Sequence, residues 1–440
     1  MLDLDKNKLG EELLDLAQRI FPLNRSLTGD GNRQTLKILK EYISDLQIYE
    51  VESGTTAFDW IVPNEWKVDE AYILTPDGEK ICDYHLNNLN LVGYSIPFEG
   101  SLTLDDLNTH LYSNDEMPEA IPYVTSFYNE SWGFCISRTD REKLKDGTYH
   151  IVVKTKLFKG SMTYGEVLID GESEQEIFMS TYICHPSMAN NEVSGPTVLI
   201  YILKWLQERG VKPRYSIRAV FVPETIGSIY YLSKNLPELK EKVIAGLNYT
   251  CVGDDRTYSI LHSKYGNTTV DKLAAHVIKM VCPRHMMYGW CDRGSDERQY
   301  CSPNVDLPFI SLMRSKHTEY PEYHTSLDTI GEVVTASGLF GGFDINQKLI
   351  TAIENHYYPI TTITCEPMMS KRDLYPSVTQ GKRRPPSVRL MMNFLSWCDG
   401  TNSLVDIAEK LNIPVWDLYV IAEKMLSQKL IKKEKTNSFN

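Results

Sequence analysis

The 440-residue sequence contains no apolar run that approaches the roughly 20 residues of a membrane-spanning helix. Its first residues, MLDLDKNKLG, lack the basic stretch followed by apolar residues that is typical of a secretory signal. No two of the nine cysteines are spaced as C-x-x-C, and most, such as Cys135 and Cys398, have apolar or aromatic neighbours. We therefore expect a soluble cytoplasmic protein with reduced cysteines and no membrane partner.

The composition is that of a globular protein, with 42% hydrophobic and 24% charged residues, which excludes disordered and fibrous classes. At about 150 residues per domain, the length predicts about three domains. The net charge of −12 disfavours nucleic acid as the main partner. The charge is uneven, however, because residues 371–440 carry 12 Lys and Arg against 7 Asp and Glu. This tail is a separate electrostatic unit.

The pattern of apolar residues changes along the chain. The first 50 residues predict two helices, ELLDLAQRIF and RQTLKILKEYISDL, joined by the loop NRSLTGDGNR. From about 60 to 160, short strands separated by turns predict a β-rich block. From about 162 to 370, strands such as EIFMSTYICH alternate with amphipathic helices, which predicts an α/β fold with a partly parallel sheet. In such a fold, ligands bind at the carboxyl ends of the strands.

After the linker GKRRPP, the sequence predicts three helices and a wing, a pattern typical of a winged helix-turn-helix. The second amphipathic helix of this pair carries no basic cluster, since its polar side chains include Asp417 and Glu423. A docking surface for a protein, or for a second copy of the chain, is therefore at least as well supported as DNA binding.

Three polar residues follow apolar strands or lie among acids. His185 ends EIFMSTYICH at a strand end, although a single histidine there is more often structural. His324 lies between Glu322 and Asp328, which could orient its ring as carboxylates orient metal-bound imidazoles. Glu224 directly follows the buried strand of RAVFVPE, where poor solvation should raise its pKa, but it could equally cap a helix.

Read together, the segments ICHPSMANNEVSG, PETIGS, GSDERQY and YPEYHTSLDT resemble, in order, the motifs of the zinc leucyl aminopeptidases. The chain is more similar still to a bacterial group of aminopeptidase-like proteins linked to surface polysaccharide biosynthesis. This resemblance implies a phosphorylase/hydrolase-like α/β sheet sandwiched by helices, formed by residues 1–60 and 160–372. It also implies an inserted β-rich domain over 61–159 and a winged-helix domain over 378–440.

The resemblance also implies a metal site. His185 and His324 match the two histidine ligands and Glu224 matches the general base, whereas Asn191 stands where the family has its bridging aspartate. Asp254 is a further candidate ligand, with Glu192 as an alternative. Because Thr225 and Thr250 also stand at acidic positions of the family, three negative charges are lost, and one zinc ion is favoured over two.

The implied activity is zinc-dependent hydrolysis of an amide or peptide bond, with Glu224 taking a proton from the attacking water. The substrate would carry an N-terminal amino acid or an amide on a small or sugar-linked group. Its contacts would come from Arg293, Asp296, Glu297, Arg298 and Tyr323, although the charged members could instead form an ion-pair network. The alternatives are a peptidase fold that has lost catalysis and serves as a binding or regulatory protein and, less favoured, a DNA-binding regulator.

Overall fold

The computed structural model describes residues 5–372, 374 and 386–434, so most of the linker GKRRPP lies outside the described residues. Contacts divide the chain into two compact units. The first, here the large unit, comprises Met1–Lys264 and Met286–Asp344; the second, the small unit, comprises Tyr265–His285 and Ile345–Asn440. The domain boundaries expected from the sequence remain predictions. No helix in the described ranges is long and apolar enough to cross a membrane.

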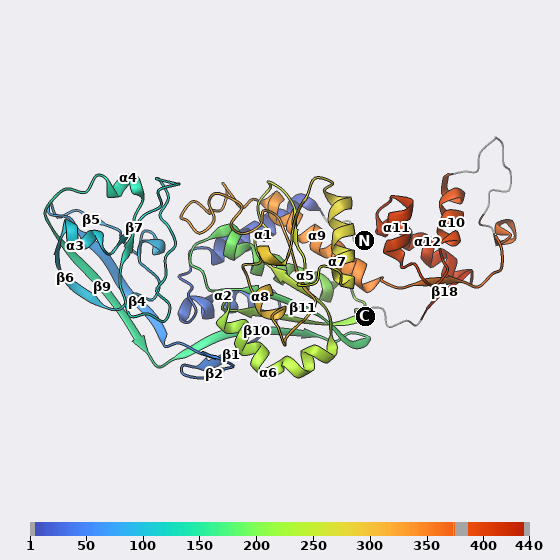
Figure 1. Cartoon of the computed structure of the whole chain (residues 1–440), viewed down its shortest axis with the longest axis horizontal. Helices are drawn as coiled ribbons and strands as arrows, with labels where there is room; N and C mark the ends of the chain where they lie inside the picture. The colour runs from blue at the N-terminus through green and yellow to red at the C-terminus, as the bar shows by residue number, and fades with distance from the viewer. Residues whose placement is uncertain (1–4, 373, 375–385, 435–440) are drawn as a thin grey trace. The chain divides into compact units, whose positions relative to one another are not determined.

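An eight-stranded mixed sheet is the core of the large unit (Figure 1). The strands run, in spatial order, β1 (Gln47–Glu52), β10 (Ser161–Ile169), β12 (Tyr215–Val222), β11 (Ser173–Tyr182), β13 (Val243–Tyr249), β16 (Phe309–Met313), β14 (Ser259–Leu261) and β15 (Met286–Tyr288). The four central strands β12, β11, β13 and β16 are mutually parallel. The last seven residues of β11 are buried, as expected for a strand covered on both faces.

Helices cover both faces of this sheet, with α6 on one side and α1 and α5 on the other (Figure 1). The helices that begin in this unit are α1 (Lys6–Ile20), α2 (Asp30–Lys40), α3 (Leu104–Asn108), α4 (Arg138–Arg141), α5 (Ser194–Glu208), α6 (Ile226–Lys242), α8 (Glu297–Tyr300) and α9 (Ala336–Glu354). The second predicted helix ends at Lys40, whereas the sequence predicted that it continues to Leu46. Residues 41–45 form turns instead, and the segment QIYEVE that follows, for which no element was predicted, forms β1 by pairing with β10.

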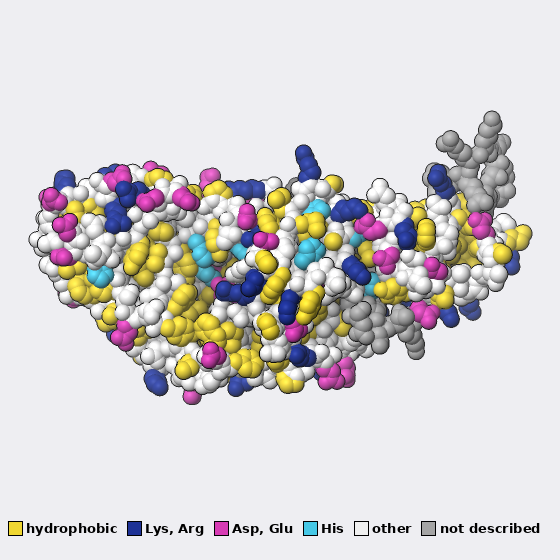
Figure 2. Space-filling model, viewed as in Figure 1, with side chains coloured by type: hydrophobic (Ala, Val, Ile, Leu, Met, Phe, Trp, Pro, Cys, Tyr) yellow, Lys and Arg dark blue, Asp and Glu magenta, His cyan; other side chains and the backbone are white. Residues whose placement is uncertain are grey.

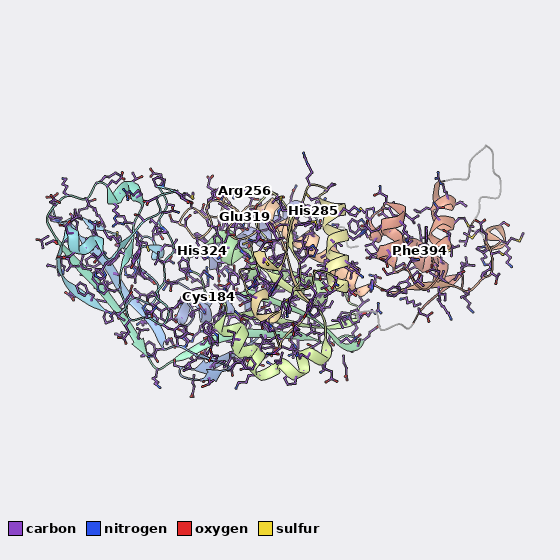
Figure 3. The ribbon with its side chains drawn as sticks, in the orientation of Figure 1. Cys184, Arg256, His285, Glu319, His324 and Phe394 are labelled. Carbon is purple, nitrogen blue, oxygen red and sulfur yellow. The ribbon has the colours of Figure 1, made fainter. Side chains whose placement is uncertain are left out.

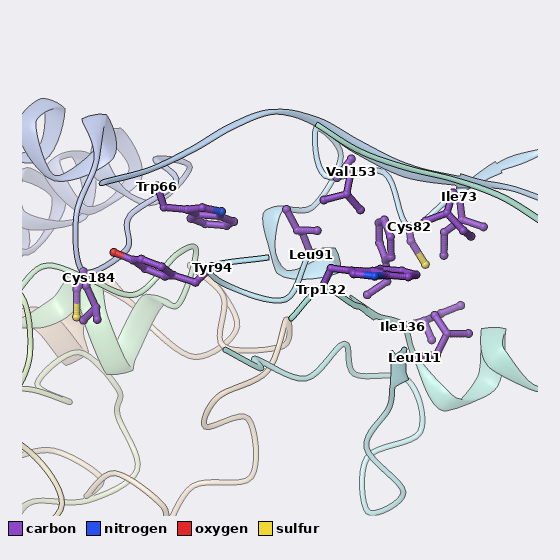
Figure 4. Packing of buried hydrophobic residues seen from close by; sticks show 14 of the residues in the cluster. Trp66, Ile73, Cys82, Leu91, Tyr94, Leu111, Trp132, Ile136, Val153 and Cys184 are labelled. Carbon is purple, nitrogen blue, oxygen red and sulfur yellow. The ribbon is translucent and has the colours of Figure 1, made fainter. Parts of the chain in front are cut away.

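The β-rich block has its own four-stranded antiparallel sheet. Its order is β5 (Lys80–Ile81), β4 (Glu65–Leu74), β9 (Thr148–Phe158) and β6 (Phe98–Thr103), and short pairs form between β2 (Thr56–Ala57) and β3 (Trp60–Ile61) and between β7 (Leu111–Tyr112) and β8 (Phe134–Cys135). Trp66 stacks on Tyr94 with 5.5 Å between ring centroids (Figure 4). Trp132 stacks on Phe98 at 4.2 Å. These aromatic pairs are therefore mainly core.

The Glu65 carboxylate links the two chain segments that connect the β-rich block to the rest of the large unit. Glu65, the first residue of β4, accepts two hydrogen bonds from the Arg33 guanidinium of α2, at 2.7 and 2.8 Å. The same carboxylate accepts a hydrogen bond from the Ser161 backbone N–H, the first residue of β10, at 3.0 Å. The bidentate pair fixes the block's two connections to α2, and it holds the pKa of Glu65 below its ordinary value of 4.5.

The small unit contains α7 (Thr269–Val281), α10 (Pro386–Ser396), α11 (Leu404–Leu411), α12 (Val415–Ser427) and an antiparallel pair of strands, β17 (Pro359–Thr361) and β18 (Ile431–Lys433). Three helices followed by a paired strand form the expected winged helix. Buried His276 of α7 bonds Glu409 of α11 at 2.6 Å and accepts the Val415 N–H of α12 at 3.0 Å. This histidine therefore joins α7 to the two helices of the helix-turn-helix.

Replacing Glu65 by Gln should make the free energy of unfolding vary less between pH 3 and pH 7. Because the folded pKa of Glu65 is lowered, its stabilisation is present above about pH 4.5 and is lost as the pH falls through the folded value. Glu65→Gln should therefore cost about 1–3 kcal/mol at pH 7, and the difference from wild type should shrink below pH 4.5. Urea unfolding between pH 3 and pH 7 measures this. The exposed Glu142→Gln is the control, and an equal loss in both variants at pH 7 would contradict the prediction.

Candidate functional site

A cavity of about 530 Å³ opens in the large unit beside the carboxyl ends of β11 and β12. Its lining includes five of the residues predicted from the sequence: His185, Glu224, Arg298, Tyr323 and His324. It also includes the aromatic residues Trp60, Tyr123, Phe127 and Tyr128, of which Tyr123 lies 5.3 Å from the His185 ring and 5.2 Å from the His324 ring, between centroids. Cys184 also lines the cavity and is labelled with His324 in Figure 3. On the face drawn in Figure 2, histidine side chains lie next to hydrophobic ones at the surface. We call this space the reaction pocket.

Strand topology brings the polar residues together. His185 follows β11 and Glu224 follows β12, and because these neighbouring strands are parallel their ends meet at one edge of the sheet. His324 lies on a loop with a left-handed backbone (φ 55°), and its ring stacks on Tyr323 at 3.9 Å between centroids. The backbone N–H of Tyr123 donates to the carbonyl of His324 at 2.9 Å, so the β-rich block holds this loop from the other side.

His185 lies close to several of the polar residues of the site. Its Nδ1 and Glu192 Oε2 share a hydrogen bond of 2.9 Å, and its Nε2 lies 3.6 Å from Glu224 Oε2. The ring centroid of His324 is 5.4 Å from that of His185. Burial lowers the pKa of His185 to about 3, and burial also lowers the pKa of His324 well below its ordinary value. Both imidazoles are therefore neutral near pH 7, the form that binds metals.

A buried arginine lies behind His185. Arg25 Nε donates to the His185 carbonyl at 3.0 Å and lies 3.5 Å from Glu192 Oε1, while another nitrogen of the same guanidinium donates to the Ile20 carbonyl. Burial lowers the pKa of Arg25, with Glu192 opposing the shift. Burial raises the pKa of Glu192 to about 8 against the effect of Arg25. Sequence reasoning missed Arg25 because NRSLTGDGNR reads as an ordinary polar loop.

Glu224 faces the pocket with 18% of its side chain exposed. Burial raises its pKa well above the ordinary value, and the nearby Asp296 carboxylate adds to the shift, as the sequence predicted for an acid behind a buried strand. Its backbone N–H donates to the Cys184 sulfur at 3.1 Å, and the Arg298 guanidinium lies 4.0 Å from its Oε1. Arg298 also donates to the Thr225 hydroxyl at 2.7 Å. The Thr225 hydroxyl thus accepts a hydrogen bond from Arg298 at the position where the zinc leucyl aminopeptidases have an acidic residue.

Three of the residues expected to contact substrate do not line the pocket. Asp296 is buried and accepts hydrogen bonds from the Thr225 N–H and the Ser228 hydroxyl. Glu297 is fully buried and accepts from the backbone N–H groups of Gly294 and Ser295. Arg293 is exposed and lies over the Trp290 ring at 4.8 Å. The first two hold the start of α8, the short helix that carries Arg298, and of this charged group only Arg298 lines the pocket.

Two of the expected metal ligands also lie outside the pocket lining. Asp254 is buried, and its two oxygens accept hydrogen bonds from Asn190, the Arg256 N–H and both the N–H and the hydroxyl of Ser315. Asn191 lies in the π-helical turn η2 (Ala189–Val193), where its Oδ1 accepts from the Tyr182 hydroxyl at 3.0 Å. Both acceptors are therefore already occupied by protein donors.

The donor set nevertheless fits one metal ion. His324 Nε2 is buried and has no hydrogen-bond partner among the described residues. His185 Nε2 faces the same pocket while Nδ1 is held by Glu192, the arrangement of metal-bound imidazoles. Zinc binds imidazole nitrogens at about 2.0–2.1 Å, a distance that two rings with centroids 5.4 Å apart could both satisfy. A second ion would lack the acidic ligands implied by the resemblance to the zinc leucyl aminopeptidases, because Asn191, Thr225 and Thr250 stand at those positions.

Two further side chains near the pocket had no signal in the sequence. Cys184 Sγ, His185 and Glu192 have possible ligand atoms within 4.8 Å of one another, but the adjacent Arg25 cation disfavours a metal there. His317 is buried behind Gly294, and neither of its ring nitrogens has a partner in the described part of the chain. Burial lowers the pKa of His317 to about 4.

Comparisons with known proteins give the family. A model described as a domain of unknown function (DUF4910) matches residues 14–356, and a winged helix-turn-helix model matches residues 357–433. A Clostridium acetobutylicum protein is 38% identical over 429 residues, covering 97% of this chain and 98% of its own length. That protein is provisionally named a polysaccharide biosynthesis protein with an aminopeptidase-like domain. The resemblance inferred from the sequence motifs is confirmed.

Solved structures agree on the fold. A C. acetobutylicum protein provisionally named a peptidase matches with a TM-score of 0.90 at 37% identity, and the match covers 98% of each chain. BSAP, a zinc aminopeptidase from Bacillus subtilis, matches with a TM-score of 0.58 at 12% identity, covering 79% of this chain and 94% of that one. The predicted α/β aminopeptidase-like fold with a C-terminal winged helix is therefore confirmed.

Replacing Arg25 by Met should strongly destabilise the protein. The substitution leaves Glu192 and the His185 carbonyl buried without their cationic partner, which typically costs about 3–5 kcal/mol. Chemical unfolding followed by tryptophan fluorescence measures the loss. Arg19→Met is the matched control, because Arg19 makes an exposed ion pair with Glu41 and should cost less than about 1 kcal/mol. Similar losses for the two variants would disprove the special role of Arg25.

Proposed function

This chain belongs to the DUF4910 family, whose fold is aminopeptidase-like, and from that premise we propose that it hydrolyses an amide bond with the help of one zinc ion. The observation that carries the proposal is the convergence of His185, His324 and Glu224 on one pocket. Two neutral imidazoles and an acid with a raised pKa are the groups that metal-assisted hydrolysis needs.

His185 and His324 would hold the ion through their Nε2 atoms. Glu192 orients the first ring through Nδ1, and the stack on Tyr323 orients the second. A bound zinc ion would supply Lewis-acid polarisation of a carbonyl and a lowered pKa for an attacking water. Asn191 and Asp254, predicted as ligands, are left out of this proposal because their oxygens are bonded to Tyr182 and to Ser315 and its neighbours.

Glu224 would move the proton. Its carboxylate takes a proton from the attacking water and then donates it to the leaving amine, and its raised pKa makes it a stronger base for the first transfer. Arg298, 4.0 Å from Glu224 Oε1, favours the ionised carboxylate that takes the proton from water and that is restored once the amine is protonated. The Cys184 sulfur, which accepts the Glu224 N–H, fixes the backbone that carries this acid.

The aromatic residues of the pocket lining would select the substrate. Trp60 and Tyr128 pack edge to face at 6.1 Å, and both are partly exposed to the cavity and solvent. Such rings accept an apolar side chain or the CH face of a sugar. The relative's name connects it with polysaccharide biosynthesis. We therefore propose an amide-bearing substrate that is small, peptide-like or sugar-linked.

A second candidate is a binding protein that keeps this fold without catalysis. It is favoured by the neutral residues at three acidic positions of the family, Asn191, Thr225 and Thr250. Thr250 shares a hydrogen bond of 2.6 Å with the Tyr182 hydroxyl and so serves the core. Zinc content distinguishes the two candidates, since a catalytically degenerate site would purify without metal. The winged helix would then present a surface to a protein or to a second copy of the chain.

The protein should bind about one zinc ion per chain. His185→Ala and His324→Ala should each reduce the bound zinc to a small fraction of this, because each removes one of the two imidazole ligands. Elemental analysis after dialysis against trace zinc measures the stoichiometry. His150→Ala, at an exposed position of the β-rich block, should retain the metal. Two ions per chain, or none in the wild type, would refute the one-ion site.

Replacing Glu224 by Gln should lower kcat/KM about 10²- to 10⁴-fold while zinc remains bound, because the proton-transfer group is lost and the imidazoles are kept. Release of p-nitroaniline from a panel of aminoacyl p-nitroanilides measures the rate. Glu99→Gln, an exposed change, should leave the rate unaltered. Full activity in the Glu224 variant would exclude this residue as the base.

A further inference from the structure

A second cavity, of about 400 Å³, lies in the same unit and contributes nothing to the proposed reaction. It is lined by Asn24 after α1, by Tyr84, Asn87 and Asn88 of the β-rich block, and by Ser187, Ser326 and Thr329 of two loops. Its volume is within the range of small-molecule sites, about 300–1,000 Å³. We call it the amide cavity because three asparagines line it.

The amide cavity differs from other polar cavities in its charge. Among the described residues that line it there is no Asp, Glu, Lys or Arg. The other large cavity of the β-rich block is, by contrast, lined by Lys80, Asp83 and Asp140 with further charged residues. A charged ligand would lose its hydration in the amide cavity without an opposite charge to replace it. The lining therefore selects a neutral ligand.

The polar groups of the amide cavity are held in place by the protein. Asn88 Nδ2 donates to the Ser187 hydroxyl at 2.8 Å, and the Asn88 Oδ1 is buried without a partner among the described residues. Asn87 Oδ1 accepts the Leu89 N–H at 3.0 Å, and the Ser326 hydroxyl accepts the Ile121 N–H at 3.0 Å. Fixed amides and hydroxyls offer both donors and acceptors, beside the aromatic ring of Tyr84.

We propose that the amide cavity is a binding site for a neutral sugar. A pyranose presents several hydroxyls that each donate and accept, which fits asparagine amides and serine or threonine hydroxyls. It also presents an apolar CH face, which fits an aromatic ring such as Tyr84. An extended peptide shares the need for amide partners but offers few hydroxyls to Ser187, Ser326 and Thr329.

The site is separate from the reaction pocket but adjoins it. The space between them is lined by Asn88 of the amide cavity and by Tyr123 and Thr125 of the reaction pocket, and has only about 20 Å³. That is room for one or two water molecules and not for a sugar ring. Ser187 and Ser326, however, each lie two residues after a proposed metal ligand, His185 and His324. A bound sugar would therefore contact both loops that carry these histidines.

Saturation-transfer NMR on the full-length protein, without added metal, tests the proposal independently of any hydrolytic activity. The probes are N-acetylglucosamine and glucose, with glucose 6-phosphate and glycylglycine amide as the charged and peptide-like comparisons. The neutral sugars should receive saturation and the comparisons should receive little. Asn88→Ala and Thr329→Val should weaken sugar binding at least fivefold, because each removes polar groups from the lining.

Asp77→Ala is the matched control, because Asp77 lines the other cavity of the β-rich block and its ion pair with Lys145 is exposed. It should bind the sugars as the wild type does, and thermal melting should find all three variants folded. The proposal is overturned if neither sugar binds at millimolar concentration, if glycylglycine amide binds better than the sugars, or if the folded Asn88 and Thr329 variants bind like the wild type. A protein without zinc or activity could still bind the sugars, so failure of the proposed function is a distinct result.

Discussion

The contact between the Arg25 guanidinium and the Glu192 carboxylate is the constraint on which the polar residues of the reaction pocket depend. Both groups are about 1% exposed, so neither has water to replace its partner. Arg25 also binds the carbonyl of His185, and Glu192 binds its ring, which fixes that residue at the backbone and at Nδ1. Of the two ring nitrogens, only Nε2 then faces the pocket, so the position of this atom determines which ligands the site can bind.

Much of the fold and part of the site could be predicted from the sequence. The alternation of apolar strands and amphipathic helices indicates a partly parallel sheet, and the ends of two such strands carry His185 and Glu224. Arg25 could not be predicted, because its partner His185 is 160 residues away and the pairing leaves no local pattern. The strand β1 was not predicted for the same reason, since its extended backbone pairs with β10, which is more than 100 residues away in the chain.

Asn191, Thr225 and Thr250, which stand at positions that are acidic in the zinc leucyl aminopeptidases, all make hydrogen bonds within the protein. Asn191, Thr250 and Tyr182 form one buried hydrogen-bonded group, and Thr225 binds Arg298. Two adjacent metal cations would need a negatively charged ligand between them. These positions instead carry an amide and two hydroxyls, which form hydrogen bonds with neighbouring side chains. The acids that remain near the pocket are Glu224, Glu192 and Asp296, and burial raises the pKa of each, which favours their neutral forms.

The register between β1 and β10 shows how the β-rich block is joined to the main sheet. Glu52, the last residue of β1, pairs directly with Ser161, the first residue of β10. The polypeptide thus departs from the main sheet and rejoins it at opposed positions of a single antiparallel ladder, which an ordinary tight turn could equally connect. A hairpin tip is a place where foreign sequence can be accommodated without disturbing the pairing on either side. The β-rich block therefore occupies the place of one turn between β1 and β10, so its length and sequence are not constrained by the pairing of these two strands.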